Sequence, residues 1–154
     1  MVAERIEKFT IDHLDDCAHL FMSAFNAEPW NDKYTLDTAK KQLAWHLKVP
    51  GCVGLVSVKE GMVVAFAIGY REPTDDGDVF HLNILCVRPE AQRTGVGSRL
   101  LWNLEERLRD TRVRAVYLST RKGTPAEYFY EKHGYTTSAE DIEMSHDLEN
   151  PERG

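Results

Sequence analysis

Several common functional patterns are missing from this 154-residue sequence. Its three cysteines, Cys17, Cys52 and Cys86, are an odd number without a CxxC pair, which argues against a disulfide framework and against a thiolate zinc site. The six histidines show no His-Glu-x-x-His spacing, so we predict no metal. Basic residues are not in excess either. The formal net charge of −6 argues against nucleic acid as a partner and weakly favours cationic ligands.

Long apolar segments are also missing. The longest strongly apolar stretch, residues 62–70, is far too short to span a bilayer. Residues 1–8 carry charges of both signs and no apolar run, unlike a signal peptide. We therefore expect a cytoplasmic protein that has no membrane partner.

The amino-acid composition suits one globular domain. Hydrophobic residues make up 42% and charged residues 29%, as in ordinary soluble domains. A chain of this length can bury a core without disulfides or metals. Because we find no repeat and no linker, we predict a single domain over residues 1–154.

The hydrophobic pattern predicts alternating groups of strands and helices. Apolar residues at helical spacing predict helices after Asp12, from Leu36, over 95–108 and over 125–132. Strands are predicted at 2–9, 52–58, 62–70, 79–87, 115–119, 135–138 and 142–148. The order β-α-α-β-β-β-α-β-α-β-β indicates an α/β (mixed α+β) fold, a mixed sheet with helices on its faces. Within 79–87, Leu85 falls in the polar register, which suggests a bulge near Ile84 and Leu85.

The junction between strand 79–87 and the next helix carries the clearest chemical signal. Residues 92–97 read Gln-Arg-Thr-Gly-Val-Gly and open the helix. Backbone N–H groups at a helix start favour an anion, the glycines allow close approach, and Arg93 can bond phosphate. Leu100 replaces the third glycine of a dinucleotide site, and no Lys-Ser/Thr pair follows for a Walker site. A helix start whose glycines serve packing alone remains the alternative.

Segment 92–97 resembles motif A of the GNAT superfamily of N-acetyltransferases, Gln/Arg-x-x-Gly-x-Gly/Ala. Residues 126–135, Ala-Glu-Tyr-Phe-Tyr-Glu-Lys-His-Gly-Tyr, are similar to a second segment of that family, Ala-x-x-Phe/Leu-Tyr-x-x-x-Gly-Phe/Tyr. The Val-Arg-Pro-Glu lead-in at 87–90 and the element order also match. The resemblance implies the GNAT fold, with a mostly antiparallel central sheet. It also implies direct transfer of an acetyl group from acetyl-CoA to a primary amine.

The resemblance implies roles for particular residues. The pantetheine arm would meet backbone groups of Leu85, Cys86 and Val87. The pyrophosphate would be held by Gln92, Arg93, Thr94, Gly95, Val96 and Gly97. Tyr130 matches the tyrosine that lies beside the CoA sulfur and can protonate the leaving thiolate, although it could also be a core residue. Gly123 departs from the family, which often has Asn there, so that contact to CoA must be absent or supplied elsewhere.

His81 is the candidate general base. It matches a strand position at which several family members carry a glutamate, and histidine titrates at roughly 6.5 when unperturbed. Asn83, one step further on the same face, could orient a water or the acceptor. The alternative is a histidine satisfied by polar neighbours in the sheet. Cys86 fits a small buried hydrophobe better than a nucleophile.

The acceptor is expected beside residues 25–32, which join the first two helices. This stretch bears some similarity to the corresponding part of aminoglycoside 6'-acetyltransferases. Trp30, with the acids Glu28 and Asp32, would suit a small cation. The alternative is a structural loop with solvated acids.

Three functions stay open at this point. The first is acetylation of a small cationic amine, and the second is acetylation of a protein lysine or N-terminus. The third is a CoA-binding domain without turnover. A homodimer is also left open, and the sequence does not identify the acceptor or the acyl chain.

Overall fold

The computed structural model describes residues 3–149 and divides the chain into two compact units, Met1–Ser119 and Thr120–Gly154. A single domain over residues 1–154 therefore stays a prediction. The predicted first strand, 2–9, is shorter in the structure, and its first residue, Val2, lies outside the described residues.

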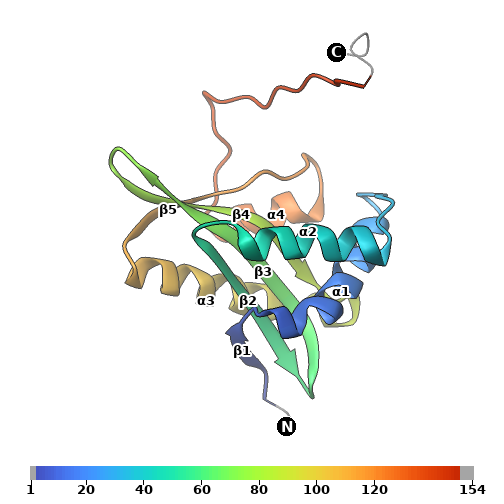
Figure 1. The fold of residues 1–154 in the computed structure, drawn as a ribbon. Helices are drawn as coiled ribbons and strands as arrows, with labels where there is room; N and C mark the ends of the chain where they lie inside the picture. The colour runs from blue at the N-terminus through green and yellow to red at the C-terminus, as the bar shows by residue number, and fades with distance from the viewer. Residues whose placement is uncertain (1–2, 150–154) are drawn as a thin grey trace. The chain divides into compact units, whose positions relative to one another are not determined.

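A five-stranded sheet organises the first unit (Figure 1). Its elements are β1 (Arg5–Lys8), η1 (Ile11–His13), α1 (Leu14–Asn26), α2 (Leu36–Lys48), β2 (Cys52–Lys59), β3 (Met62–Thr74), β4 (Gly77–Val87), η2 (Pro89–Ala91), α3 (Val96–Asp110) and β5 (Val113–Tyr117). The strand order is β1-β2-β3-β4-β5, with antiparallel neighbours except for the parallel pair β4 and β5. The predicted mixed, mostly antiparallel sheet with flanking helices is confirmed.

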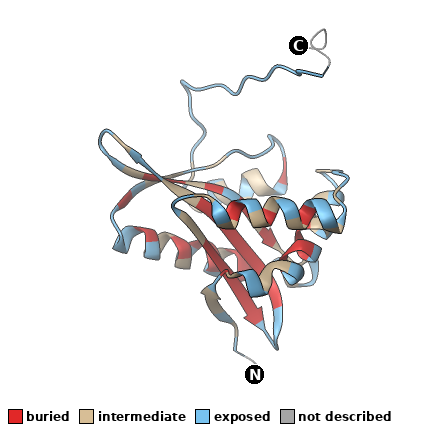
Figure 2. Ribbon diagram, viewed as in Figure 1, coloured by how far each residue is buried: buried red, intermediate tan, exposed pale blue. Residues whose placement is uncertain are grey.

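Helices cover both faces of this sheet (Figure 1). The buried faces of α1 and α2 form one core with Val56, Phe66 and Ile68 of the sheet. The buried residues of α3 lie outside that core and cover the other face: Val96, Gly97, Leu100, Leu101, Leu104 and Leu108. Figure 2 shows the buried residues concentrated along the central strands. Apolar side chains at a spacing of 3.6 residues thus form one face of each helix, and each helix packs on the sheet through that face.

A bulge in β4 lies at Asn83, slightly before the predicted position. Ile68 pairs with Ile84, but its neighbour Gly69 pairs with Leu82, so Asn83 is the extra residue. Gly69, on the neighbouring strand β3, explains why the bulge lies at Asn83. A Cβ on Gly69 would lie 2.0 Å from the carbonyl oxygen of His81, so only glycine allows this close approach.

We expect Gly69→Ala to destabilise the fold by forcing β4 away from β3. The clash should lower the free energy of unfolding by about 1–3 kcal/mol in urea denaturation. Gly61→Ala is the control, because a Cβ there would meet no atom within 4 Å and tests the strain of its positive φ alone. Equal losses in the two variants would contradict the close approach at Gly69.

Strands β4 and β5 separate part of the way along β4. Their ladder runs from Asp78 and Val113 to His81 and Tyr117. Beyond His81, β4 continues to Val87, and the described residues supply no further pair with β5. The edge of β4 that follows His81 therefore faces an opening instead of a strand.

The second unit contains α4 (Pro125–Lys132). Thr124 caps its start, because its side chain accepts the backbone N–H of Glu127. At its end, Gly134 adopts a left-handed φ of 90°, and the N–H groups of Gly134 and Tyr135 donate to Glu131 and Tyr130. This is the pattern of a Schellman cap.

The two C-terminal strands predicted at 135–138 and 142–148 are wrong, because the structure has irregular chain over both ranges. Ile142, Met144 and Leu148 are exposed there. Alternating apolar residues confer strand propensity, but a strand also requires pairing with a neighbouring strand, and the described part of this unit contains no strand.

Every helix among the described residues is too short or too polar to cross a lipid bilayer.

Candidate functional site

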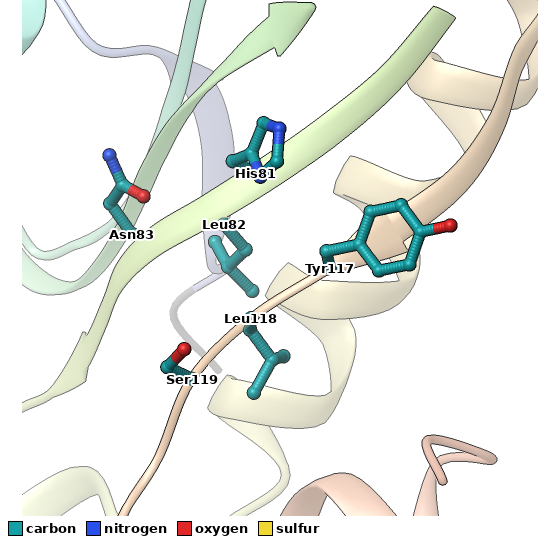
Figure 3. A pocket seen from close by; sticks show the side chains of 6 residues that line it. All are labelled: His81, Leu82, Asn83, Tyr117, Leu118 and Ser119. Carbon is teal, nitrogen blue, oxygen red and sulfur yellow. The ribbon is translucent and has the colours of Figure 1, made fainter. Parts of the chain in front are cut away.

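A pocket lies where β4 and β5 separate (Figure 3). It is lined by His81, Leu82, Asn83, Tyr117, Leu118 and Ser119. Two of the predicted site residues, His81 and Asn83, are therefore brought together here. The bulge at Asn83 and the end of the β4–β5 ladder coincide, which explains why the opening forms at this point.

His81 lies in an aromatic and acidic environment. Its ring is 4.9 Å from that of Tyr70 and 6.1 Å from that of Tyr117, with tilts of 31° and 34°. Its Nε2 is 2.9 Å from Oε1 of Glu72. With the hydrogen on Nε2, His81 donates to the carboxylate, which leaves Nδ1 to accept a proton. A carboxylate–histidine pair of this kind can hold the ring for acid–base work.

Sequence reasoning missed three partners of this histidine, namely Glu72, Tyr70 and Tyr117. Tyr70 lies opposite His81 in the β3–β4 register, and Glu72 lies on the same strand two residues further. The hairpin extends to Thr74, beyond the predicted end at Tyr70, which brings Glu72 onto the sheet. A register count from the turn at residues 74–77 could have found Glu72, because the bulge at Asn83 lies beyond His81 and leaves that count intact.

The predicted phosphate-binding loop is a sharp turn that leads into α3. Arg93 and Gly95 both adopt left-handed conformations, with φ of 65° and 87°. The side chain of Gln92 donates to the carbonyl of Val87 at 3.2 Å, and the Thr94 hydroxyl donates to the carbonyl of Ala91. Gln92, Arg93 and Thr94 are exposed, whereas Val96 and Gly97 are buried. An anion at this helix start would meet backbone N–H groups and exposed side chains, so the residues present fit a pyrophosphate.

The predicted pantetheine segment lies on β4 after the bulge. Leu85 and Val87 are half-buried, and Cys86 is buried in the core with α1 and α2. Burial raises the pKa of the Cys86 thiol well above its ordinary value, and the nearby Cys17 adds to the rise. The thiol therefore stays protonated, which supports a packing role for Cys86 over that of a nucleophile.

The predicted acceptor loop is compact and partly built on aromatic packing. The half-buried Trp30 lies 5.5 Å from Phe25 between ring centroids. Asn26 closes the loop by two hydrogen bonds to the backbone of Tyr34, of 2.9 and 2.8 Å. Glu28 and Asp32 are exposed. These two acids and Trp30 are not among the six residues that line the pocket, so their role at the acceptor stays a prediction.

Tyr130 lies in the second unit, on α4. It is half-buried, and its ring is 5.3 Å from that of Phe129 and 5.5 Å from that of Tyr135. The contact with Tyr135 is the apolar contact that accompanies a Schellman cap. Its role at the leaving thiolate stays a prediction.

Within residues 3–149, no group of three or more His, Cys, Asp and Glu side chains is arranged to hold a metal ion.

Several solved structures share this fold. A possible acetyltransferase from Clostridium difficile 630 superposes with a TM-score of 0.79 at 19% identity, over 94% of this chain and 98% of that one. The aminoglycoside N-acetyltransferase AAC(6')-Iy, solved in complex with CoA, gives a TM-score of 0.75 at 14% identity, over 96% and 97%. An aminoglycoside acetyltransferase from an uncultured soil metagenomic sample gives 0.74 at 17% identity, over 94% and 96%. At these identities the likeness shows the fold alone.

Sequence comparison gives the family. No curated protein matches the chain. Residues 14–135, most of the chain, match the family described as Acetyltransferase (GNAT) family. The match contains β4, the turn at 92–97, α3 and α4, which are the elements that carry the candidate catalytic and cofactor-binding residues. The chain therefore belongs to the GNAT family of acetyltransferases.

Proposed function

We propose that this protein transfers an acetyl group from acetyl-CoA to a primary amine of a small cationic molecule. The observation that carries the proposal is the opening between β4 and β5. It has the His81–Glu72 pair at one end, and the turn at 92–97 follows the far end of the same strand.

Acetyl-CoA would bind along the second half of β4. Beyond His81 this strand has an edge without a strand partner in the described chain, which supports pairing with the amide groups of pantetheine as an added strand. The pyrophosphate would occupy the turn, against the N-terminus of α3, and Arg93 would add charge-assisted bonds. Tyr130 would supply the proton to the sulfur.

The reaction needs a neutral amine, and His81 would provide it. An alkyl ammonium gives up a proton, directly or through a water, to Nδ1 of His81, while Glu72 holds Nε2. The amine nitrogen then bonds to the thioester carbonyl carbon, and the carbon–sulfur bond breaks. The thiolate takes a proton from Tyr130, and the proton that the nitrogen loses as the amide forms returns through water to the tyrosinate. Asn83, exposed at the bulge, would orient the amine or the water.

A cationic acceptor suits the charges and rings around this opening. Tyr117 is half exposed and lines the pocket, so its ring can contact an ammonium group. Glu72 adds a negative charge next to His81, and Glu28, Trp30 and Asp32 would bind the remote part of the acceptor. Because these acids are exposed, each should contribute about 1 kcal/mol or less.

The proposal is tested by offering acetyl-CoA with a panel of small polyamines, amino sugars and lysine peptides, and measuring released thiol. We expect the fastest turnover with a small cationic amine. His81→Ala should lower kcat by about 10²-fold and flatten the acidic limb of the pH profile, because the proton acceptor is lost.

His19→Ala is the matched control, since His19 is an exposed histidine on α1 that bonds the carbonyl of Asp15. Its kinetics should equal those of the unaltered protein. Turnover with lysine peptides alone would support a protein acceptor instead. Binding of acetyl-CoA without any thiol release across the panel would support a domain without turnover.

A further inference from the structure

The turn that precedes α3 contains one residue, Arg93, in a backbone conformation that its residue type does not favour. Arg93 has a left-handed φ of 65°, an unfavourable conformation for a residue with a side chain, and Gly95 follows at 87°. Thr94 lies between them. Such a backbone persists only where surrounding contacts determine it, and these positions often occur at ligand sites.

One side chain ties this turn to the sheet. Nη1 of Arg99 donates to the carbonyl oxygen of Thr94 at 3.3 Å. The same guanidinium donates through Nε to Oε2 of Glu4 at 2.8 Å, and its Nη2 lies 2.6 Å from that oxygen. The other oxygen of Glu4 accepts the hydroxyl of Ser57 at 2.7 Å. Glu4, just before β1, and Ser57, on β2, thus anchor a residue of α3 that holds the turn.

The carboxylate that holds Arg99 is shielded from solvent, whereas the arginine itself is not. The side chain of Glu4 is 14% exposed and Ser57 is fully buried, but the side chain of Arg99 is 54% exposed. The shielded carboxylate is screened less by solvent and salt than an exposed one would be. The planar fork of Arg99 lets it bond Glu4 and Thr94 in fixed directions, which a lysine cannot do.

We propose that Glu4 and Arg99 are positioning residues that keep the turn at Thr94 and Gly95 ready for the pyrophosphate of CoA. This inference rests on the proposed binding of acetyl-CoA at the turn. Arg99 acts through the carbonyl of Thr94 and the backbone around it, not by touching phosphate. Its positive charge is already paired with Glu4.

The test compares two acyl donors with the 154-residue chain. Acetyl-CoA contains the pyrophosphate, whereas S-acetylpantetheine lacks it. We expect Glu4→Gln to raise the KM for acetyl-CoA about 3- to 10-fold, with kcat unchanged and with S-acetylpantetheine kinetics unchanged. Arg99→Lys should give the same pattern. The double variant should be no worse than either single variant, because the two residues act as one unit.

Glu106→Gln is the matched control, since it removes one carboxylate of an exposed ion pair with Arg109 further along α3. It should leave both donors unaffected. If Arg99 bound phosphate directly, releasing it by Glu4→Gln would leave acetyl-CoA binding intact or tighten it, and that result would overturn the proposal. Equal losses with both donors would also overturn it, because the defect would then be general.

Failure of this inference is distinct from failure of the proposed function. If the unaltered protein does not bind acetyl-CoA in titration calorimetry, the proposed function is wrong. If it binds and Glu4→Gln binds equally well, only the positioning role is wrong. Circular dichroism of each variant establishes that it is folded, and Arg99→Lys carries the test if Glu4→Gln does not fold.

Discussion

Gly95→Val should abolish the thermal stabilisation that acetyl-CoA gives to the unaltered protein. Two features of the turn cause this. Gly95 has a φ of 87°, which a β-branched residue rarely adopts, and a Cβ there would lie 2.7 Å from Nη1 of Arg99. The guanidinium can move, but moving it breaks the bond to the carbonyl of Thr94. We expect the affinity for acetyl-CoA to fall by at least about tenfold, measured by thermal shift and titration calorimetry.

Gly61→Val separates this effect from general strain. Gly61 has a similar positive φ of 74°, and a Cβ there would meet nothing within 4 Å. This variant should lose stability but keep its response to acetyl-CoA. Unchanged affinity in Gly95→Val would show that the turn does not hold the cofactor. A donor fragment without phosphate should give little stabilisation even in the unaltered protein.

Tyr130→Phe should lower kcat while the KM for acetyl-CoA changes little. If the phenol protonates the leaving thiolate in the transition state, the loss should be about 10- to 10⁴-fold. The substitution keeps the ring, and hence its packing against Phe129 and Tyr135, so α4 should keep its C-terminal cap. Pre-steady-state measurement of thiol release isolates the chemical step.

Tyr128→Phe is the control for this prediction. Tyr128 lies on the same helix, two residues earlier, and is 71% exposed. Its variant should match the unaltered protein. If kcat of Tyr130→Phe stays within about twofold where chemistry limits the rate, the tyrosine has a packing role only.

The elements that depend on local sequence were predicted well. The helix over 95–108 follows from apolar residues at helical spacing and is observed as Val96–Asp110. The turn at 92–97 follows from its glycines, which supply the left-handed φ at Gly95. The cap of α4 follows from Gly134 in the same way. In each case the interacting groups lie within a few residues of one another.

Predictions that depended on pairing between distant segments were less accurate. The bulge lies at Asn83 because Gly69, on another strand, allows the backbone to approach it there. Glu72 reaches His81 only because β3 extends to Thr74, which the apolar pattern of residues 62–70 did not indicate. The ranges 135–138 and 142–148 have the alternating pattern of strands, but the structure has irregular chain there.

The sequence alone determined the family, the helices and the glycine turn, because these depend on short-range spacing and on motifs that stay together along the chain. Only the tertiary structure decided the site. The separation of β4 from β5 creates the opening, strand register brings Glu72 to His81, and Glu4 anchors Arg99 across 95 positions of sequence. The physical reason is that strand register and side-chain packing between distant segments arise only when the sheet assembles. The local pattern of residues along the chain does not specify either of them.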